Sequence, residues 1–282
     1  MTDRLVIIPT FNEIENIEAI IRRVFSLSTA FDLLIVDDGS PDGTAAVVKH
    51  LQAEFPQQLH LLERRGKLGL GTAYIDGFKW ALARGYEFLF EMDADFSHNP
   101  DDLVRLYNAC ATGGADVAVG SRYIKGVNVV NWPIGRVLMS YGAGIYVRFI
   151  TGMPIMDPTA GFVCYRAHVL NVLLQNPIRF VGYAFQIEMK FTCWKYGFTL
   201  KEVPIIFTDR TRGESKMSTR IFKEAILGVI QMKINSFFRH YIPVKKATAT
   251  YPTPNPSPLK RGTSPEYAEA VSLPKEKGLG VG

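Results

Sequence analysis

The sequence predicts an α/β fold in which a mostly parallel sheet is covered by helices on both faces. Four short apolar runs, "LVIIP", "LLIVDD", "FLFEMD" and "DVAVGS", lack the polar alternation of a half-exposed strand. Segments with apolar residues at helical spacing separate these runs, and polar residues follow each of them. Strands buried on both faces read as uninterrupted apolar runs, and their alternation with helices is typical of parallel sheets.

The first half of the chain supplies four strand and helix units in order. After the strand at residues 5–9, apolar residues recur at helical spacing from Ile17 to Val24, and the same spacing follows the third run at Leu103 and Leu106. After the second strand, "GSPDGT" favours a helix start with Ser40 as N-cap and Pro41 at the first helical position. The fourth run ends in Gly120, Ser121 and Arg122.

The second half predicts, in order, a helix over 133–150, a turn and strand in "DPTAGFVCYR", a helix over 185–196, a strand in "TLKEVPIIF", a polar basic loop in "TDRTRGESKMST" and a helix over 220–240.

On the last helix, Glu224, Gln231 and Asn235 form a narrow polar arc, and most other positions are apolar. This pattern is too polar to span a bilayer and fits either an interfacial helix or a helix packed on its own domain. We therefore divide the chain into a catalytic domain at 1–217, an amphipathic membrane-interface helix at 218–242 and a disordered tail at 243–282 that is rich in Pro, Thr, Ser and Lys.

Composition and charge exclude some classes of function. The formal net charge is +5, but the tail after Pro243 holds six Lys or Arg and three Glu, which leaves about +2 on the rest of the chain. This is too little to indicate a nucleic-acid-binding protein. The three cysteines, Cys110, Cys164 and Cys193, form no CxxC pair and suit a reducing compartment, and "MTDRLVIIPTFNE" shows no signal peptide. We expect a cytoplasmic protein.

Two carboxylates, Asp93 and Asp95, stand at the end of the third apolar run. Like charges this close repel one another unless a cation lies between them. Hard oxygen ligands select Mg²⁺ or Mn²⁺, which typically take one or two carboxylates plus substrate phosphates. Ligands of parallel sheets bind at the carboxyl ends of the strands, where Asp37 and Asp38 would also lie. An aspartyl-phosphate phosphatase also places Asp-x-Asp after a strand, but it leaves the Asp37–Asp38 pair without a role.

Seven motifs in this order, "IPTFNE", "VDDGSPDGT", "GLGTAYIDG", "MDADFSHNP", "GSRY", "DPTAGF" and "DRTRGESK", resemble those of the dolichol-phosphate (polyprenyl-phosphate) mannose synthases. The resemblance covers about residues 4–240. It implies a GT-A-type nucleotide-sugar-binding fold and an inverting glycosyltransferase that moves mannose from GDP-mannose to a polyprenyl phosphate.

The resemblance also implies the site residues. Nucleotide contacts fall on Pro9, Phe11, Glu13, Val36 and Asp38, and the diphosphate and its metal fall on Asp93, Ala94 and Asp95. Phosphate-handling cations fall on Arg122, Arg136, Arg210 and Lys216, and Asp157 of "DPTAGF" falls near the sugar. The family usually has Tyr where Phe11 stands, and it often has Asp-x-Thr-Gly where Ala160 is inserted here.

Elementary chemistry agrees with this implied reaction. A phosphate monoester has a second pKa near ~6 and is mostly ionised at pH 7, so it needs cations rather than a general base. We expect one-step displacement with inversion, closure of the 210–216 loop over bound substrate, and docking of the enzyme on the membrane that holds the lipid, through its own helices or through a membrane-anchored partner subunit. A UDP-sugar donor and a catalytically idle nucleotide-sugar-binding scaffold remain alternatives.

Overall fold

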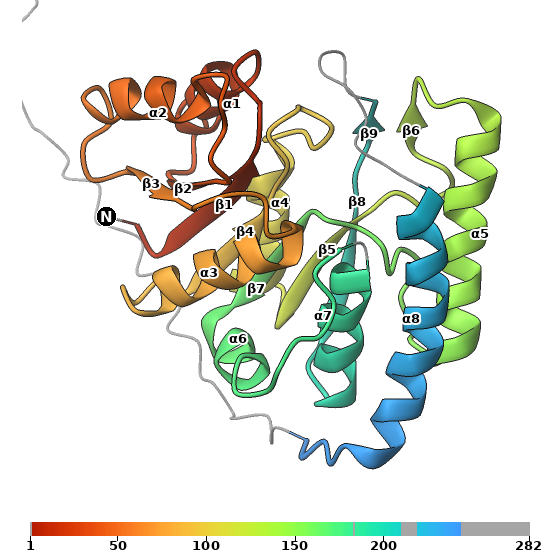
Figure 1. Cartoon of the computed structure of the whole chain (residues 1–282). Coiled ribbons are helices and arrows are strands. Elements are labelled where there is room, and N and C mark those ends of the chain that lie inside the picture. Colours follow the sequence, from red (N-terminus) through yellow and green to blue (C-terminus); the bar gives the residue numbers. More distant parts are fainter. Residues whose placement is uncertain (1, 183, 210–218, 244–282) are drawn as a thin grey trace, which may run out of the picture. The chain divides into compact units, whose positions relative to one another are not determined.

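The computed structural model describes residues 2–182, 184–209 and 219–243, with the side chains of 219–225 left out. One seven-stranded sheet has the order β3-β2-β1-β4-β7-β5-β8, and a separate two-stranded sheet pairs β6 with β9 (Figure 1). The strands are β1 (Arg4–Thr10), β2 (Asp32–Asp37), β3 (Leu59–Glu63), β4 (Phe88–Glu91), β5 (Val117–Ser121), β6 (Val129–Val130), β7 (Val163–Arg166), β8 (Leu200–Pro204) and β9 (Phe207–Thr208).

Helices cover both faces of the large sheet, as predicted. The side chains of α1 (Ile17–Phe25), α2 (Thr44–Gln52) and α4 (Asp102–Ala111) form one core with alternate residues of the central strands, including Val6 and Ile8 of β1. On the opposite face, α3 (Leu70–Leu82), α6 (Ala167–Leu173) and α7 (Ala184–Lys195) form a second core with Leu5 and Ile7. Because successive residues of β1 enter opposite cores, the strand needs an uninterrupted apolar run.

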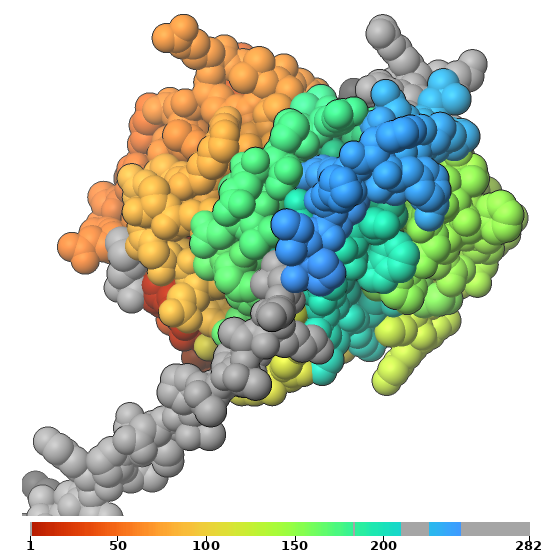
Figure 2. Space-filling view, turned by 90° about the horizontal axis from the view of Figure 1, so that it is seen from below, coloured from red at the N-terminus to blue at the C-terminus, as the bar shows by residue number. Residues whose placement is uncertain are grey.

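A third core joins α7 to α5 (Ile134–Thr151) and α8 (Thr219–Phe238). Val147 of α5, Phe191 of α7 and Val229 of α8 are among its buried members. Viewed from below, α8 lies over α7 and beside α5 (Figure 2). One face of α8 is therefore packed on its own domain. Other apolar residues of α8, such as Leu227 and Phe237, are exposed.

One local expectation is wrong. The helix after β2 begins at Thr44 with Gly43 as N-cap, not at Pro41 with Ser40 as N-cap. The backbone N–H and the hydroxyl of Ser40 both donate to the Asp37 carboxylate, at 2.9 and 2.6 Å, so Ser40 is occupied by the turn before the helix. Asp42 instead accepts the backbone N–H of Thr44 at 3.0 Å. The predicted strand "TLKEVPIIF" is likewise divided between β8 and β9.

Strand direction decides which segments meet. β1, β2, β4 and β5 run parallel, so their carboxyl ends share one edge of the sheet. β7 is antiparallel to its neighbours β4 and β5, so the turn before β7, residues 157–161, lies at that same edge. Within the described residues, no helix is both long enough and apolar enough to cross a bilayer. The expected tail at 243–282 lies, apart from residue 243, outside the described residues.

Candidate active site

A cavity of about 780 Å³ lies at the shared edge of the strands. Asp93 and Asp95, which follow β4, line it together with Arg122, which follows β5, and Arg136 of α5. The structure thus brings four predicted site residues to one cavity. Arg210 and Lys216 lie outside the described residues.

The Asp93–Asp95 turn is fixed by its own backbone contacts. The N–H of Asp93 donates to Nδ1 of His98 at 3.2 Å, and Asp95 Oδ1 accepts the N–H of Ser97 at 3.0 Å. His98 is buried and stacks on Phe162 at 4.8 Å between ring centroids. Burial lowers the pKa of His98 to about 4, against the attraction of Asp95, so the ring is neutral near pH 7. His98 therefore shapes this turn.

The donor set at this turn fits a hard divalent cation. Among the residues that the structure describes, no cluster of three or more His, Cys, Asp or Glu side chains could hold a metal ion by itself. Two carboxylates beside an open cavity match the coordination preference of Mg²⁺, which typically binds one or two protein carboxylates and completes its coordination shell with water and substrate phosphates. Asp93 and Asp95 are the residues that would hold such an ion.

The ends of β1 and β2 form the predicted nucleotide side. Asp37 is committed to structure, since it accepts the Thr10 hydroxyl at 2.9 Å and also binds Ser40. Asp38 instead pairs with Arg64, with 3.1 Å between Oδ1 and Nε, and both side chains are almost fully buried. Burial raises the pKa of Asp38, and Arg64 opposes this shift. The two neighbouring acids thus have different roles.

Arg64 was not predicted from the sequence. It follows β3, its Nη2 donates to the Thr72 hydroxyl at 2.8 Å, and its Nη1 lies 3.6 Å from Oδ2 of Asp76. With the Asp38 pair, these contacts hold a buried positive charge at the carboxyl end of β3. The signal was the position of "ERRGK", directly after a strand whose carboxyl end reaches the same edge.

The other predicted nucleotide residues lie near this pair. Lys67 places its ammonium 5.0 Å from the ring centroid of Phe11. Glu13 accepts the amide of Asn16 at 3.1 Å, and Pro9 is half-buried in β1. The side chain of Val36 is buried within the second core, so only its backbone is available to a nucleotide.

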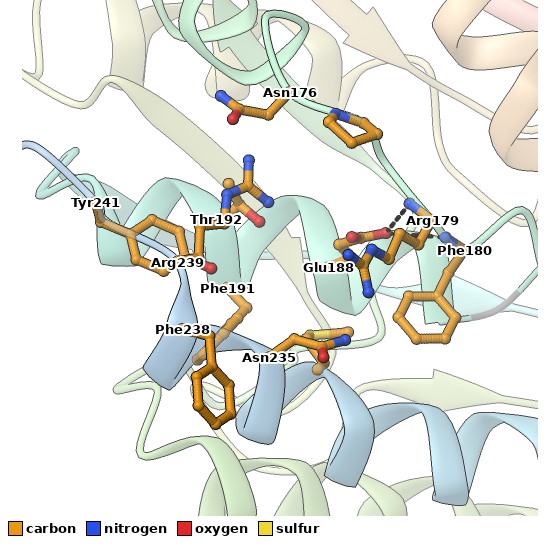
Figure 3. Close-up of a pocket in the computed structure, with 12 residues that line it drawn as sticks. Asn176, Arg179, Phe180, Glu188, Phe191, Thr192, Asn235, Phe238, Arg239 and Tyr241 are labelled. Atoms are coloured by element: carbon orange, nitrogen blue, oxygen red, sulfur yellow. Dashed lines mark hydrogen bonds between the residues drawn. The ribbon is translucent and has the colours of Figure 1, made fainter.

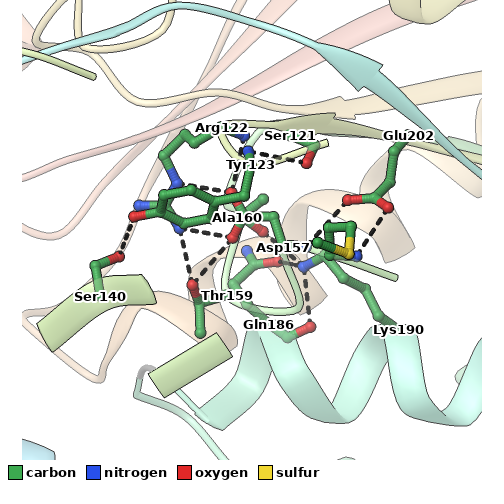
Figure 4. Close-up of polar contacts among 11 residues, drawn as sticks. Ser121, Arg122, Tyr123, Ser140, Asp157, Thr159, Ala160, Gln186, Lys190 and Glu202 are labelled. Carbon is green, nitrogen blue, oxygen red and sulfur yellow. Dashed lines mark hydrogen bonds and ion pairs between the residues drawn. The ribbon is translucent and has the colours of Figure 1, made fainter. Parts of the chain in front are cut away.

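Arg122 is held by a buried ion pair (Figure 4). Its Nε and Nη2 donate to the two oxygens of Asp157 at 2.7 Å each, and Nη2 also donates to the Thr159 hydroxyl at 2.8 Å. Burial acts to raise the pKa of Asp157, but the charge and hydrogen bonds of Arg122 bring it below the ordinary value. Nη1 has no hydrogen bond within the described residues. Arg122 therefore offers one nitrogen to the cavity, and Asp157 anchors Arg122.

Arg136 and Arg122 share an aromatic wall. Arg136 lies 4.1 Å from the ring centroid of Trp132 and pairs with Asp209 at 2.8 Å. Arg122 lies 5.7 Å from the same ring and 5.6 Å from that of Phe207. The small β6–β9 sheet sets this geometry by placing Val129 opposite Phe207. Trp132 lies in none of the seven motifs, and Asp209, the first residue of "DRTRGESK", had been given no role; both are additional residues of this site.

Much of the remaining lining is apolar, although polar residues such as Ser140 and Gln186 also lie on it. Its apolar part comes mainly from α5, α7 and α8 and includes Leu138, Met139, Ala143, Tyr146, Val147, Ile187, Ile226 and Val229. A charged corner that continues into an apolar channel suits a ligand with an anionic head and a hydrocarbon tail.

A second cavity, of about 310 Å³, lies between the α6–α7 connection, α7 and α8 (Figure 3). None of the predicted site residues lines it. Its buried Glu188 accepts the backbone N–H groups of Arg179 and Phe180 at 2.9 Å each, which fixes the connection before α7.

The comparison with protein families decides the assignment. Residues 5–174 match the family described as "Glycosyl transferase family 2". This chain belongs to glycosyl transferase family 2. It is 46% identical over 230 residues to the polyprenol monophosphomannose synthase of Mycolicibacterium smegmatis, and the aligned region covers 82% of this chain and 86% of that protein. It is 45% identical over 225 residues to the undecaprenyl-phosphate mannosyltransferase of Micrococcus luteus, with coverage of 80% and 91%.

Solved structures confirm the GT-A-type fold of this family 2 member. Glucosyl-3-phosphoglycerate synthase of Mycobacterium tuberculosis superposes with a TM-score of 0.59 at 18% identity, covering 86% of this chain and 87% of that one. A mannosyltransferase of Pyrobaculum calidifontis, solved with GDP-Man and Mn²⁺, superposes with a TM-score of 0.51 at 14% identity, covering 84% and 74%. At these identities the likeness concerns the fold alone.

Proposed function

We propose that this family 2 glycosyltransferase moves mannose from GDP-mannose to a polyprenyl monophosphate, with inversion at the anomeric carbon. One observation carries the proposal: a single cavity joins the Asp93–Asp95 pair, the Arg122 and Arg136 cations and an apolar channel. Two relatives named for mannosyl transfer to polyprenyl phosphates, each near 45% identity over most of both chains, support the same reaction.

The acceptor phosphate occupies the corner beneath Arg122 and Arg136. Its second pKa near ~6 leaves it mostly dianionic at pH 7, so no residue has to remove a proton from it. Arg122 offers Nη1 from a fixed guanidinium, and Arg136 adds a second positive charge on the same aromatic wall. The first isoprene units of the lipid fill the channel between α5, α7 and α8.

The donor lies between this corner and the Asp38–Arg64 pair. Arg64 and Asp38 read the polar edge of the base, and Phe11 contributes an apolar surface. Asp93 and Asp95 are the residues that would hold a Mg²⁺ or Mn²⁺ ion, and such an ion would supply positive charge beside the diphosphate. The Pyrobaculum mannosyltransferase is described with GDP-Man and Mn²⁺, and this favours the same donor and class of metal here.

The reaction is a single displacement. An oxygen of the acceptor phosphate forms a bond to the anomeric carbon as the bond to the GDP oxygen breaks, and that electron pair leaves with GDP. His98 is neutral and donates no proton at this step. The protein holds the acceptor phosphate and the donor diphosphate in line against their electrostatic repulsion. Binding energy thereby brings the two reacting groups together in the geometry of the displacement. Arg210 and Lys216, outside the described residues, are proposed to complete the phosphate contacts, and closure of the 210–216 loop is proposed to exclude water.

The enzyme docks on the cytoplasmic face of the membrane that holds its acceptor. Each methylene of a polyprenyl chain favours the lipid phase by about 0.8 kcal/mol, so the acceptor does not leave the bilayer. Exposed apolar residues of α5 and α8, such as Phe149 at 85% and Phe238 at 84% exposure, provide a surface for docking. A membrane-anchored partner subunit that covers this surface is the alternative occupant.

A donor panel tests the proposal. Radiolabelled GDP-mannose, UDP-glucose and UDP-GlcNAc are each incubated with enzyme, polyprenyl phosphate and Mg²⁺ or Mn²⁺, and the organic-soluble product is counted. We expect label from GDP-mannose and a loss of transfer in Asp95→Asn. Label from UDP-glucose or UDP-GlcNAc alone would overturn the mannose assignment. Binding of GDP-mannose without any transfer would favour the scaffold alternative.

A further inference from the structure

Lys190 of α7 is a fully buried cation that the reaction described above does not use. Its Nζ donates to three oxygens, the carbonyl of Ala160 at 2.6 Å, the carbonyl of Gln186 at 3.0 Å and the Gln186 side-chain oxygen at 2.9 Å. All three acceptors are neutral, and within the described residues no carboxylate forms an ion pair with it. A buried charge without a direct counterion is costly, so its position calls for an explanation.

The contacts of Lys190 connect two parts of the catalytic edge. Gln186, whose oxygen accepts from Lys190, donates its amide to the buried Glu91 at 2.8 Å, and Glu91 ends the strand that leads into the Asp93–Asp95 turn. On its other side, Lys190 holds the carbonyl of Ala160 in the turn before β7. Burial lowers the pKa of Lys190 to about 8, although Glu91 and Asp157 both act to raise it.

The turn at 157–161 is held from three directions. Glu202 of β8 accepts the backbone N–H groups of Met156 and Asp157 at 2.8 and 3.0 Å. Arg122, directly after β5, donates to the Asp157 carboxylate, and Lys190 of α7 donates to the carbonyl of Ala160 (Figure 4). Release of any one anchor lets the turn rotate about the other two. Because Asp157 orients the guanidinium of Arg122, such a rotation moves Nη1 within the cavity.

We propose that Lys190 is a positioning residue for the acceptor phosphate: it fixes the 157–161 turn and, through Asp157, the direction of Arg122. This proposal rests on the proposed function, since it assigns the phosphate to the Arg122 corner. Lys190 makes no hydrogen bond to the base-binding residues on β1, β2 and β3, and it reaches the Asp93–Asp95 turn only indirectly, through Gln186 and Glu91. Loss of the ammonium should therefore affect the acceptor more than the donor.

The test compares Lys190→Met, Lys190→Gln and the control Lys195→Met. Lys195 lies on the same helix, but it is half-buried, its ammonium lies 5.2 Å from the Tyr241 ring centroid, and it does not line the catalytic cavity. Initial rates are measured against polyprenyl phosphate at saturating GDP-mannose and against GDP-mannose at saturating acceptor. Circular dichroism and thermal melting establish that each variant is folded.

We expect Lys190→Met to lose about 10-fold or more in kcat/KM for polyprenyl phosphate, since small displacements of a positioned group are costly. The KM for GDP-mannose should stay within about twofold, because Lys190 reaches the donor side only through Gln186 and Glu91, whereas it contacts the 157–161 turn directly. Lys190→Gln, whose amide can still donate to the carbonyl of Ala160, should show a smaller loss in kcat/KM than Lys190→Met. Lys195→Met should have wild-type kinetics.

A folded Lys190→Met enzyme with wild-type kinetics toward the acceptor would overturn the proposal, and so would a loss expressed mainly in the KM for GDP-mannose. If Lys190→Met does not fold, the same criteria apply to Lys190→Gln. Failure of the wild-type enzyme to transfer mannose would overturn the proposed function instead. That outcome is separate, because it appears before any variant is compared.

Discussion

Replacing Asp157 by Asn should destabilise the protein strongly, because it leaves Arg122 buried without its counterion. The side chains of Arg122 and Asp157 are 10% and 1% exposed, and two hydrogen bonds of 2.7 Å join them. Removing one partner of a buried ion pair typically costs about 3 to 5 kcal/mol of unfolding free energy. For a domain of this size, such a loss lowers the melting temperature by roughly 6 to 20 °C.

The pH dependence of this loss follows from the pKa of Asp157. Its folded pKa lies below the ordinary value, so the ionised carboxylate stabilises the fold at pH values above the unfolded pKa of about 3.9. The difference between wild type and Asp157→Asn should be complete near neutral pH. It should shrink as the pH falls from about 3.9 through the lower folded pKa.

Guanidinium-induced unfolding followed by circular dichroism measures the effect. Glu63→Gln is the control, since it breaks the exposed pair with Lys49 and should cost at most about 1 kcal/mol. The double variant Arg122→Met with Asp157→Asn removes the uncompensated charge and should recover much of the lost stability without recovering transferase activity. If Asp157→Asn unfolds at the same denaturant concentration as Glu63→Gln, the pair does not carry the charge balance that we assign to it.

Three further outcomes are expected. EDTA should abolish mannosyl transfer and Mg²⁺ or Mn²⁺ should restore it in wild type but not in Asp95→Asn; activity that survives EDTA would remove the metal from the scheme. Gly77→Ala should cost roughly 1 to 3 kcal/mol, because an added Cβ would lie 2.7 Å from Cγ2 of Ile7, whereas Gly135→Ala, with open space, should be neutral or stabilising in guanidinium unfolding. Burial raises the pKa of the Cys164 thiol, so it should react with a thiol reagent only after denaturation; rapid labelling of the native protein would contradict this.

The strands and their polar ends could be predicted because their signals are local. A continuous apolar run such as residues 33–36 indicates burial on both faces without knowledge of its neighbours, and the helix spacing after it indicates a crossover. Parallel direction then places Asp38, Asp95 and Arg122 at one edge. These inferences needed only short stretches of sequence and the geometry of parallel sheets.

The partners of the site residues could not be predicted in the same way. Asp157 and Arg122 lie 35 positions apart and meet only because β7 runs against β4 and β5. Strand direction depends on the neighbours that a segment finds in three dimensions, and "DPTAGFVCYR" gives no local sign of it. The prediction of Ser40 as an N-cap failed for a related reason. Its hydroxyl donates to the Asp37 carboxylate, and the sequence gives no local sign of this contact.

The reversed β7 also places its two ends at opposite edges of the sheet. Its last residue, Arg166, and the start of α6 lie at the edge of the sheet away from the cavity, where the N–H of Ala167 bonds to the carbonyl of Glu87 before β4. A peptide inserted at this junction would interrupt that hydrogen-bonded connection, but it would extend away from the cavity. A peptide inserted at Thr159 would enter the cavity instead, so seven positions along the chain separate two insertions with opposite effects on the site.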